Sequence, residues 1–292
     1  MVEDRTFSYR LCLKFIHVYL ILLALFCMFP LIHIFAISLS DAAAVSAGMV
    51  KLWPVHFTMD SFNYVVSNHA FISSIYISLK RIVIGVSIAM TINILCAYPL
   101  SKSNLDFSGR TVYVWIFVFS MLFSGGLIPT FLIVKQLGLL DTIWALTLPN
   151  AVMVFNIVLM LNFFRNLPKE LEEASFMDGA GHWAILMKIY IPLSMPSIAT
   201  ILLFSIVGYW NEWFMGIIYM NRIENYPLSS YLQTIIIRDA AIESSSLNEL
   251  NAINDRTAKA AQIFIGSIPV LVVYPFLQKY FANGLTLGSV KE

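Results

Sequence analysis

Six long apolar stretches set the strongest limit on how this chain can fold. A bilayer core takes about 20 mainly apolar residues per helix, and stretches of that length occur near 15–39, 75–100, 111–134, 143–164, 197–220 and 261–281. Of the 292 residues, 59% are hydrophobic and only 12% are charged, against roughly 25% charged residues in soluble domains. The pattern predicts an all-α, polytopic membrane protein. We expect one transmembrane domain over residues 1–292, with no room for a soluble catalytic domain.

A polar island at 166–196 separates the fourth stretch from the fifth. Glu, Ala and Met favour helix, glycines allow a sharp bend, and prolines end the unit. We expect one helix at about Pro168–Met177 and another at about His182–Tyr190, with Gly179 in the turn between them. A polar helix–Gly–helix between two spans has to lie against the membrane surface, where another protein can bind it. The alternative is that Gly179 merely ends a surface helix.

Basic residues predict the orientation. Arg5, Arg10 and Lys14 precede the first span, and the residues just beyond it offer only Asp41. This bias places the N-terminus in the cytoplasm. Six crossings then place the polar island and the C-terminus, with Lys279 and Lys291, on the cytoplasmic side as well.

The third stretch is interrupted by Ser124-Gly125-Gly126, with Pro129 shortly after. Glycine weakens a helix and proline suits the first turn of a new one. We expect a short helix at 130–137, lying at the outer interface. Broken helices often border a translocation path, but an ordinary kinked span is the alternative.

The chain lacks the residue patterns of several function classes. It has no G-x-x-x-x-G-K-[ST] phosphate-binding loop, its five histidines are scattered, and its net charge of +1 gives no hint of nucleic-acid binding. Glu212 is the only acidic residue expected within a span, which is thin support for an ion-coupled carrier. We therefore predict a non-catalytic protein without metal or cofactor, whose energy comes from elsewhere. A secondary carrier or a polytopic membrane enzyme is the alternative class.

Four motifs in order along the chain carry a resemblance to a known family. They are Phe123–Pro129 with Leu137–Ala145; Glu173-Ala174-Ser175 with Asp178-Gly179-Ala180, Ile191 and Pro192; Tyr209–Phe214; and Gln278–Phe281 with Gly284, Gly288 and Lys291. On these motifs the chain resembles the permeases of ATP-binding-cassette importers for carbohydrates. Within them it is similar to the subgroup that handles oligosaccharides from complex polysaccharides. Ser175 departs from the family's Glu-Ala-Ala pattern.

This resemblance implies the type I importer permease fold and half of a pore for a saccharide, an oligosaccharide first, with an acidic uronate oligomer as an option. The implied partners are a second homologous permease, two ATPase subunits, an extracytoplasmic solute-binding protein and the lipid of a bacterial cytoplasmic (inner) membrane. The resemblance also assigns coupling to the ATPase to one run of the polar island: Glu173, Ala174, Ser175, Met177, Asp178, Gly179 and Ala180.

Polar and aromatic residues within the spans are candidates for the substrate path. Asn156 lies in the fourth span, and Tyr209, Trp210 and Asn211 lie toward the outer half of the fifth. Amide groups suit sugar hydroxyls, and aromatic rings suit the apolar C–H faces of sugars. The alternatives are hydrogen bonds between helices for asparagine and interfacial belts for Trp and Tyr.

Two basic residues, Lys80 and Arg81, open the second span at the expected outer interface. We interpret them as anchors whose charged ends reach the interface. Attraction for an acidic saccharide is the alternative.

Overall fold

The computed structural model describes residues 7–103, 107–243 and 249–288, and over these residues the chain is helical, with a single isolated bridge between Ser40 and Phe57 in place of any sheet. The chain divides into two compact units. The first comprises residues up to 71 together with 238–267, and the second comprises 72–237 together with the residues from 268 onward. The all-α prediction is confirmed. Arg5 and Lys291, used above for the orientation and for one motif, lie outside the described residues.

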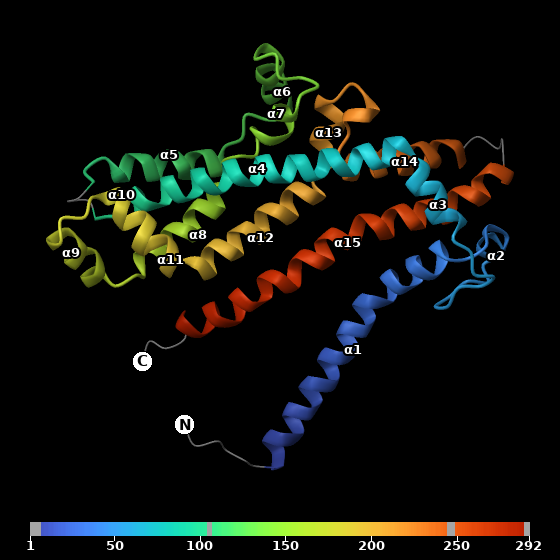
Figure 1. Ribbon diagram of the computed structural model, residues 1–292, viewed down its shortest axis with the longest axis horizontal. Helices are drawn as coiled ribbons and strands as arrows, with labels where there is room; N and C mark the ends of the chain where they lie inside the picture. Colours follow the sequence, from blue (N-terminus) through green and yellow to red (C-terminus); the bar gives the residue numbers. More distant parts are fainter. Residues whose placement is uncertain (1–6, 104–106, 244–248, 289–292) are drawn as a thin grey trace. The chain divides into compact units, whose positions relative to one another are not determined.

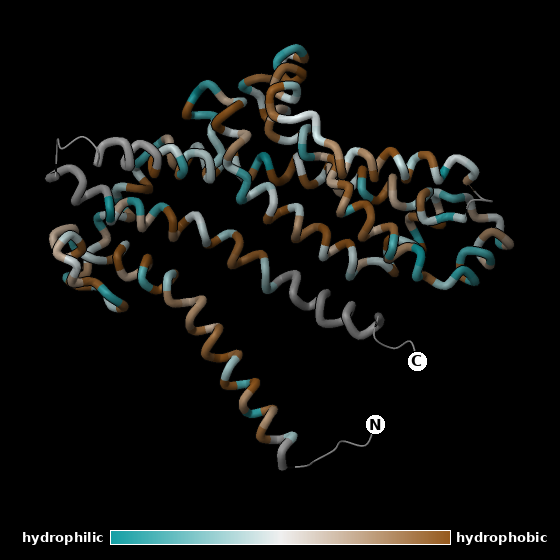
Figure 2. The backbone as a smooth tube through the Cα atoms, turned by 180° about the vertical axis from the view of Figure 1, so that it is seen from behind, coloured by the Kyte–Doolittle hydropathy of each residue, from teal (hydrophilic) through white to brown (hydrophobic). Residues whose placement is uncertain are grey.

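The first unit is built on α1 (Phe7–Ser38), most of which is apolar (Figure 2). Its Leu11–Ser38 segment is long and apolar enough to cross a membrane, yet almost all of its large side chains are exposed. A helix that is hydrophobic all round belongs in lipid or against another protein. Two short helices follow, α2 (Ala42–Ser46) and α3 (Asp60–Ser67), and the Asp41 side chain caps α2 by accepting from the Ala43 N–H at 3.1 Å.

The core of the second unit is formed by four helices that lie side by side in Figure 1: α4 (His69–Ser101), α5 (Arg110–Leu122), α8 (Val154–Arg165) and α12 (Met195–Asn211). The helix α8 packs against both α5 and α12. Its buried side chains, Ile157, Met160 and Phe164 among them, form one cluster with residues of α4, α12 and the polar island. The island is therefore anchored in the same core as the membrane helices.

The interruption predicted in the third stretch is confirmed. The helix α5 ends at Leu122, and α6 (Leu127–Gln136) begins after Gly126, whose φ is +85°. The two helices are bent by 112°. Only glycine adopts this φ without strain, so Gly126 permits the turn. The new helix begins three residues earlier than predicted and places Pro129 in its first turn.

Hydrogen bonds made by Asp141 account for the Leu137–Ala145 motif. Gly138 and Asp141 both have positive φ, and the Asp141 N–H donates to the Tyr219 carbonyl at 2.9 Å. The Asp141 carboxylate accepts from the Asn221 N–H and the Asn225 amide. The hydrogen bond from Asn225 lowers the pKa of this carboxyl group, while its slight burial acts in the opposite direction. The motif thus joins the end of α6 to the chain that follows α13 (Phe214–Tyr219).

Two predicted spans are divided in the structure. The stretch 143–164 comprises α7 (Ile143–Thr147) and α8, separated around Pro149, which lacks a backbone donor. The stretch 197–220 comprises α12 and α13, separated at Glu212 in extended geometry. The Glu212 carboxylate accepts from the Met215 N–H at 2.8 Å, which satisfies a free donor at the start of α13.

The remaining helices are a 3₁₀ turn at Ile223–Asn225, α14 (Leu228–Glu243) and α15 (Glu249–Gly288). By length and apolar character, three described helical segments can cross a membrane: Leu11–Ser38, His69–Ser101 and Arg256–Pro275. Two bent pairs qualify together, α5 with α6, and His182–Leu193 with α12, whereas α8 is shorter. The six crossings and the one-domain organisation stay predictions.

Candidate coupling loop and substrate path

The polar island folds as two short helices about a glycine turn. It comprises α9 (Lys169–Met177), α10 (His182–Ile185), a π-helical turn at Leu186–Tyr190 and α11 (Ile191–Leu193). Gly179 has a φ of +80°. The Ala180 N–H donates to the Ser175 carbonyl at 2.9 Å, and the Gly179 N–H donates to the Phe176 carbonyl at 3.0 Å. These are the two bonds of a Schellman cap, which ends a helix on a left-handed glycine. The predicted helix–Gly–helix with its turn at Gly179 is confirmed.

The residues assigned to coupling lie on the outside of this turn. Five of them are exposed, Glu173, Ala174, Met177, Asp178 and Gly179, while Ser175 and Ala180 are half-buried. The Met177 side chain is 88% exposed, and Trp183 beyond the turn is 62% exposed. Exposed apolar side chains beside a bare glycine turn suit insertion into a partner's groove. That these residues dock onto an ATPase stays a prediction.

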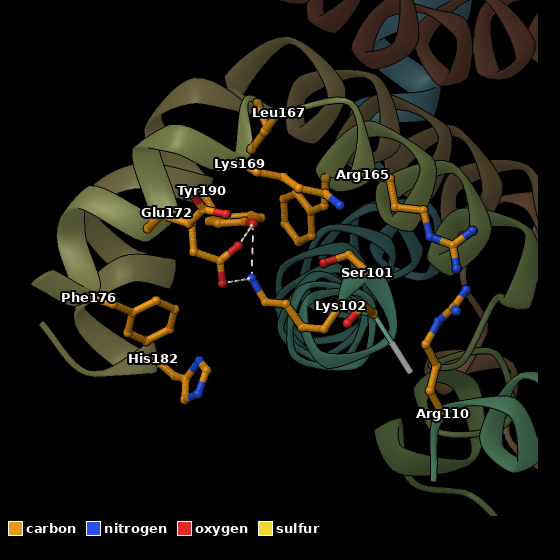
Figure 3. A pocket seen from close by; sticks show the side chains of 13 residues that line it. Ser101, Lys102, Arg110, Arg165, Leu167, Lys169, Glu172, Phe176, His182 and Tyr190 are labelled. Atoms are coloured by element: carbon orange, nitrogen blue, oxygen red, sulfur yellow. Dashed lines mark hydrogen bonds and ion pairs between the residues drawn. The ribbon is translucent and has the colours of Figure 1, made fainter. Parts of the chain in front are cut away.

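A cluster on the inner side of α9 was not predicted from the sequence. A cavity of about 870 Å³ beside this helix is lined by Ser101, Lys102, Phe164, Glu172, His182 and Tyr190, among others (Figure 3). The Lys102 ammonium donates to Glu172 Oε1 at 2.5 Å and to the Tyr190 hydroxyl at 2.9 Å. Lys102 and Glu172 are 70 positions apart, so no local pattern pairs them. The only sequence signal for this pair was that the two residues have opposite charges and were predicted to lie on the same side of the membrane.

Of the four substrate-path candidates, three are buried within the packing of this unit. Asn156 is 3% exposed and its amide donates to the Ser205 hydroxyl at 3.4 Å, so it joins α8 to α12. Tyr209 is 2% exposed and donates to the Thr147 carbonyl at 3.0 Å. Trp210 is also buried, whereas Asn211, the last residue of α12, is exposed. Asn211 is therefore the candidate whose side chain is open to a ligand.

The interpretation of Arg81 as an interfacial anchor was wrong. The helix α4 begins at His69, so Arg81 lies well inside it, and its side chain is fully buried. Its guanidinium forms an ion pair with the Glu212 carboxylate and lies 5.6 Å from the centre of the Tyr209 ring. Because this charge is already paired, Arg81 does not support attraction for an acidic saccharide either. The adjacent Lys80 is exposed.

The fold of the chain matches that of a membrane subunit of a bacterial ABC transporter. Over 96% of this chain and the whole of the other, the structure superposes on a chain from the crystal structure of a bacterial ABC transporter involved in the import of the acidic polysaccharide alginate, with a TM-score of 0.84 and 35% sequence identity. The type I importer permease fold expected from the sequence is thereby confirmed.

Sequence comparison identifies the family. The chain belongs to the binding-protein-dependent transport system inner membrane components, whose sequence pattern matches residues 15–287. It is 42% identical to the polygalacturonan/rhamnogalacturonan transport system permease protein YtcP of Bacillus subtilis (strain 168), over 97% of this chain and 99% of that protein. Protein LplC of the same strain is 40% identical over 90% of this chain and 88% of that protein.

Proposed function

We propose that this chain forms half of the pore of an ATP-driven importer for acidic oligosaccharides. A second homologous permease forms the other half, two ATPase subunits supply the energy, and an extracytoplasmic binding protein delivers the sugar. The setting is a bacterial cytoplasmic membrane, with both termini of the chain inside. The carrying observation is similarity over nearly the full chain to two transporters named for acidic polysaccharides. Polygalacturonan, like alginate, is a polymer of uronic acids.

The role of this subunit is non-catalytic. The sequence has no phosphate-binding loop that could hold ATP. An ion-coupled carrier would need a titratable group within the membrane that is available to its ion. Glu212, the acidic candidate from the sequence, is instead paired with Arg81 and caps α13. These features favour an importer subunit over the carrier.

The proposal predicts which sugar activates the complex. The chain, its partner permease, the ATPase and the binding protein are reconstituted in liposomes, and ATP hydrolysis is measured with binding protein loaded with oligogalacturonate or with a neutral malto-oligosaccharide of equal length. We expect hydrolysis to rise several-fold with the acidic sugar only. Stimulation by the neutral sugar alone would exclude the acidic class, and uptake by the lone chain in an ion gradient would exclude the importer.

We further propose that Asn211 contacts the sugar in the pore, while buried Asn156, Tyr209 and Trp210 hold the pore wall behind it. Replacing Asn211 by Ala should remove one hydrogen bond, about 1 kcal/mol, and lower apparent affinity in uptake roughly five-fold. The control is Asn221→Ala, an exposed asparagine in the connection after α13. Both variants should keep basal ATP hydrolysis. Equal uptake by Asn211→Ala and wild type would remove Asn211 from the substrate path.

A further inference from the structure

A buried lysine joins α4 to α9. Lys102 follows the last residue of α4, and its ammonium lies beside two aromatic rings, 4.1 Å from the centre of Tyr98 and 4.2 Å from the centre of Tyr190. The same ammonium donates to Glu172, and the Tyr190 hydroxyl donates to the second oxygen of that carboxylate at 2.6 Å. We call Lys102, Glu172, Tyr98 and Tyr190 the lysine clamp. Figure 3 shows Lys102, Glu172 and Tyr190 converging.

Both side chains of the ion pair are largely covered by the protein, and they also line the cavity beside α9. The side chain of Lys102 is 8% exposed and that of Glu172 is 16% exposed. An exposed ion pair contributes little because water competes for both charges. In a largely covered pair whose cation also lies close to aromatic rings, breaking one partner is costly. The clamp therefore constrains the distance between α4 and α9 far more firmly than a surface pair would.

The lysine clamp connects α4 to the polar island, two segments that are not adjacent in the sequence. The polar island is covalently continuous with α8 before it and α12 after it, whereas α4 lies 70 positions earlier in the sequence. A second contact supports the first, because the Tyr98 hydroxyl lies 3.2 Å from His182 Nδ1 on α10. The end of α4 is thus held to both helices of the island.

Two arginines fix the same end of α4 to its neighbours. The Leu100 carbonyl accepts from Arg110 Nε at 2.9 Å and from Arg165 Nη2 at 3.4 Å. The first arginine begins α5 and the second ends α8, and Figure 3 shows their guanidinium groups facing one another. Cations at a helix C-terminus are stabilised by the helix dipole. A displacement of α4 at this end is therefore shared by α5 and α8.

We infer that Glu172 and Lys102 are positioning residues that transmit movement of α9 to α4, so that α4 moves with the island although it is not covalently adjacent to it. This inference rests on the proposed docking of the island onto an ATPase. Roughly 30 Å further along α4 lies Arg81, paired with Glu212 at the end of α12. Two ion pairs thus connect α4 to other elements: Lys102–Glu172 connects it to α9, and Arg81–Glu212 connects it to the end of α12. Glu170, also on α9, is exposed and is not one of the four clamp residues.

The test measures sugar imported per ATP hydrolysed in the reconstituted complex. Glu172→Gln and Lys102→Met should each keep the ATPase bound and keep basal hydrolysis, while the transport-to-hydrolysis ratio falls about ten-fold. The double variant should be no worse than the poorer single variant, because both remove the same contact. Glu170→Gln, at an exposed glutamate of the same helix outside the run assigned to coupling, is the matched control and should keep the wild-type ratio. If the wild-type complex couples normally and both single variants keep its ratio, the inference about the lysine clamp is wrong while the proposed function stands. A wild-type complex without sugar-stimulated hydrolysis would instead overturn the proposed function.

A chemical bridge separates transmission from folding. In a chain with Cys12, Cys27 and Cys96 replaced by Ser, the pair Lys102→Cys and Glu172→Cys is connected by a short bis-methanethiosulfonate reagent. We expect the ratio to recover at least five-fold on bridging and to fall again when the bridge is reduced. A ratio that stays low after complete bridging would contradict a mechanical role for this contact.

Discussion

Replacing Arg81 by methionine is expected to destabilise the folded protein by about 3–5 kcal/mol, the cost of leaving one partner of a buried ion pair alone. The guanidinium donates to the Glu212 carboxylate, to the Glu212 carbonyl at 2.8 Å and to the Leu146 carbonyl at 3.2 Å. Methionine fills much of the same space without a donor, so these acceptors lose the guanidinium together, although Ser229 still donates to the Glu212 carbonyl and the Met215 N–H to the carboxylate. Thermal unfolding of the detergent-purified complex measures the effect.

Two further variants make this prediction specific. Lys80→Met removes the neighbouring charge on the same helix, but Lys80 is exposed, so we expect a change within about 0.5 kcal/mol. Arg81→Met combined with Glu212→Gln should recover part of the loss, because no unpaired charge is left. If Arg81→Met unfolds at the same temperature as Lys80→Met, the pair does not stabilise this fold.

Local signals in the sequence were sufficient for the coupling loop. The helix-forming residues of α9, the glycine at its end and the prolines after it are all short-range features, and the structure follows them to within about one residue. The break at Gly126 is also a short-range feature, because glycine and proline act on their own backbone, although the helix after it begins three residues earlier than predicted. In both segments the conformation is decided by residues a few positions apart.

Contacts between distant residues were beyond reach. Arg81 and Glu212 are 131 positions apart, and nothing near Arg81 distinguishes a buried, paired arginine from one that reaches the interface. The break between α12 and α13 depends on the same pair, because the Glu212 carbonyl is taken by Arg81 and by Ser229. The break at Pro149 was different. Proline is a local signal, but the apolar residues on both sides of it led us to predict one continuous span.

Gly179→Val is expected to leave the protein inserted in the membrane but to abolish sugar import. Among the described residues, a Cβ at Gly179 would meet no atom within 4 Å apart from its own chain neighbours, so the cost to the isolated subunit is backbone strain on the order of 1–2 kcal/mol. The bare turn instead suits close approach by a partner. We propose that Met177, Ala174 and Ala180 enter a groove on the ATPase, and that closure of the two ATPases moves the island as a lever. Valine would block that approach.

Gly138→Val is the matched control. Gly138 also has a positive φ, +67°, and a Cβ added there would likewise meet open space, but this glycine lies in the connection between α6 and α7, away from the island in the sequence. Its substitution imposes comparable strain without obstructing the coupling loop. We expect the Gly138 variant to be somewhat less stable and still coupled.

The most direct measurement is co-purification of the ATPase, together with ATP hydrolysis stimulated by sugar-loaded binding protein, in membranes that express the complete complex. Gly179→Val should lose the stimulated hydrolysis and most of the bound ATPase, and Gly138→Val should retain both. Normal values of both quantities in the Gly179 variant would contradict the role of this loop in coupling ATP hydrolysis to import.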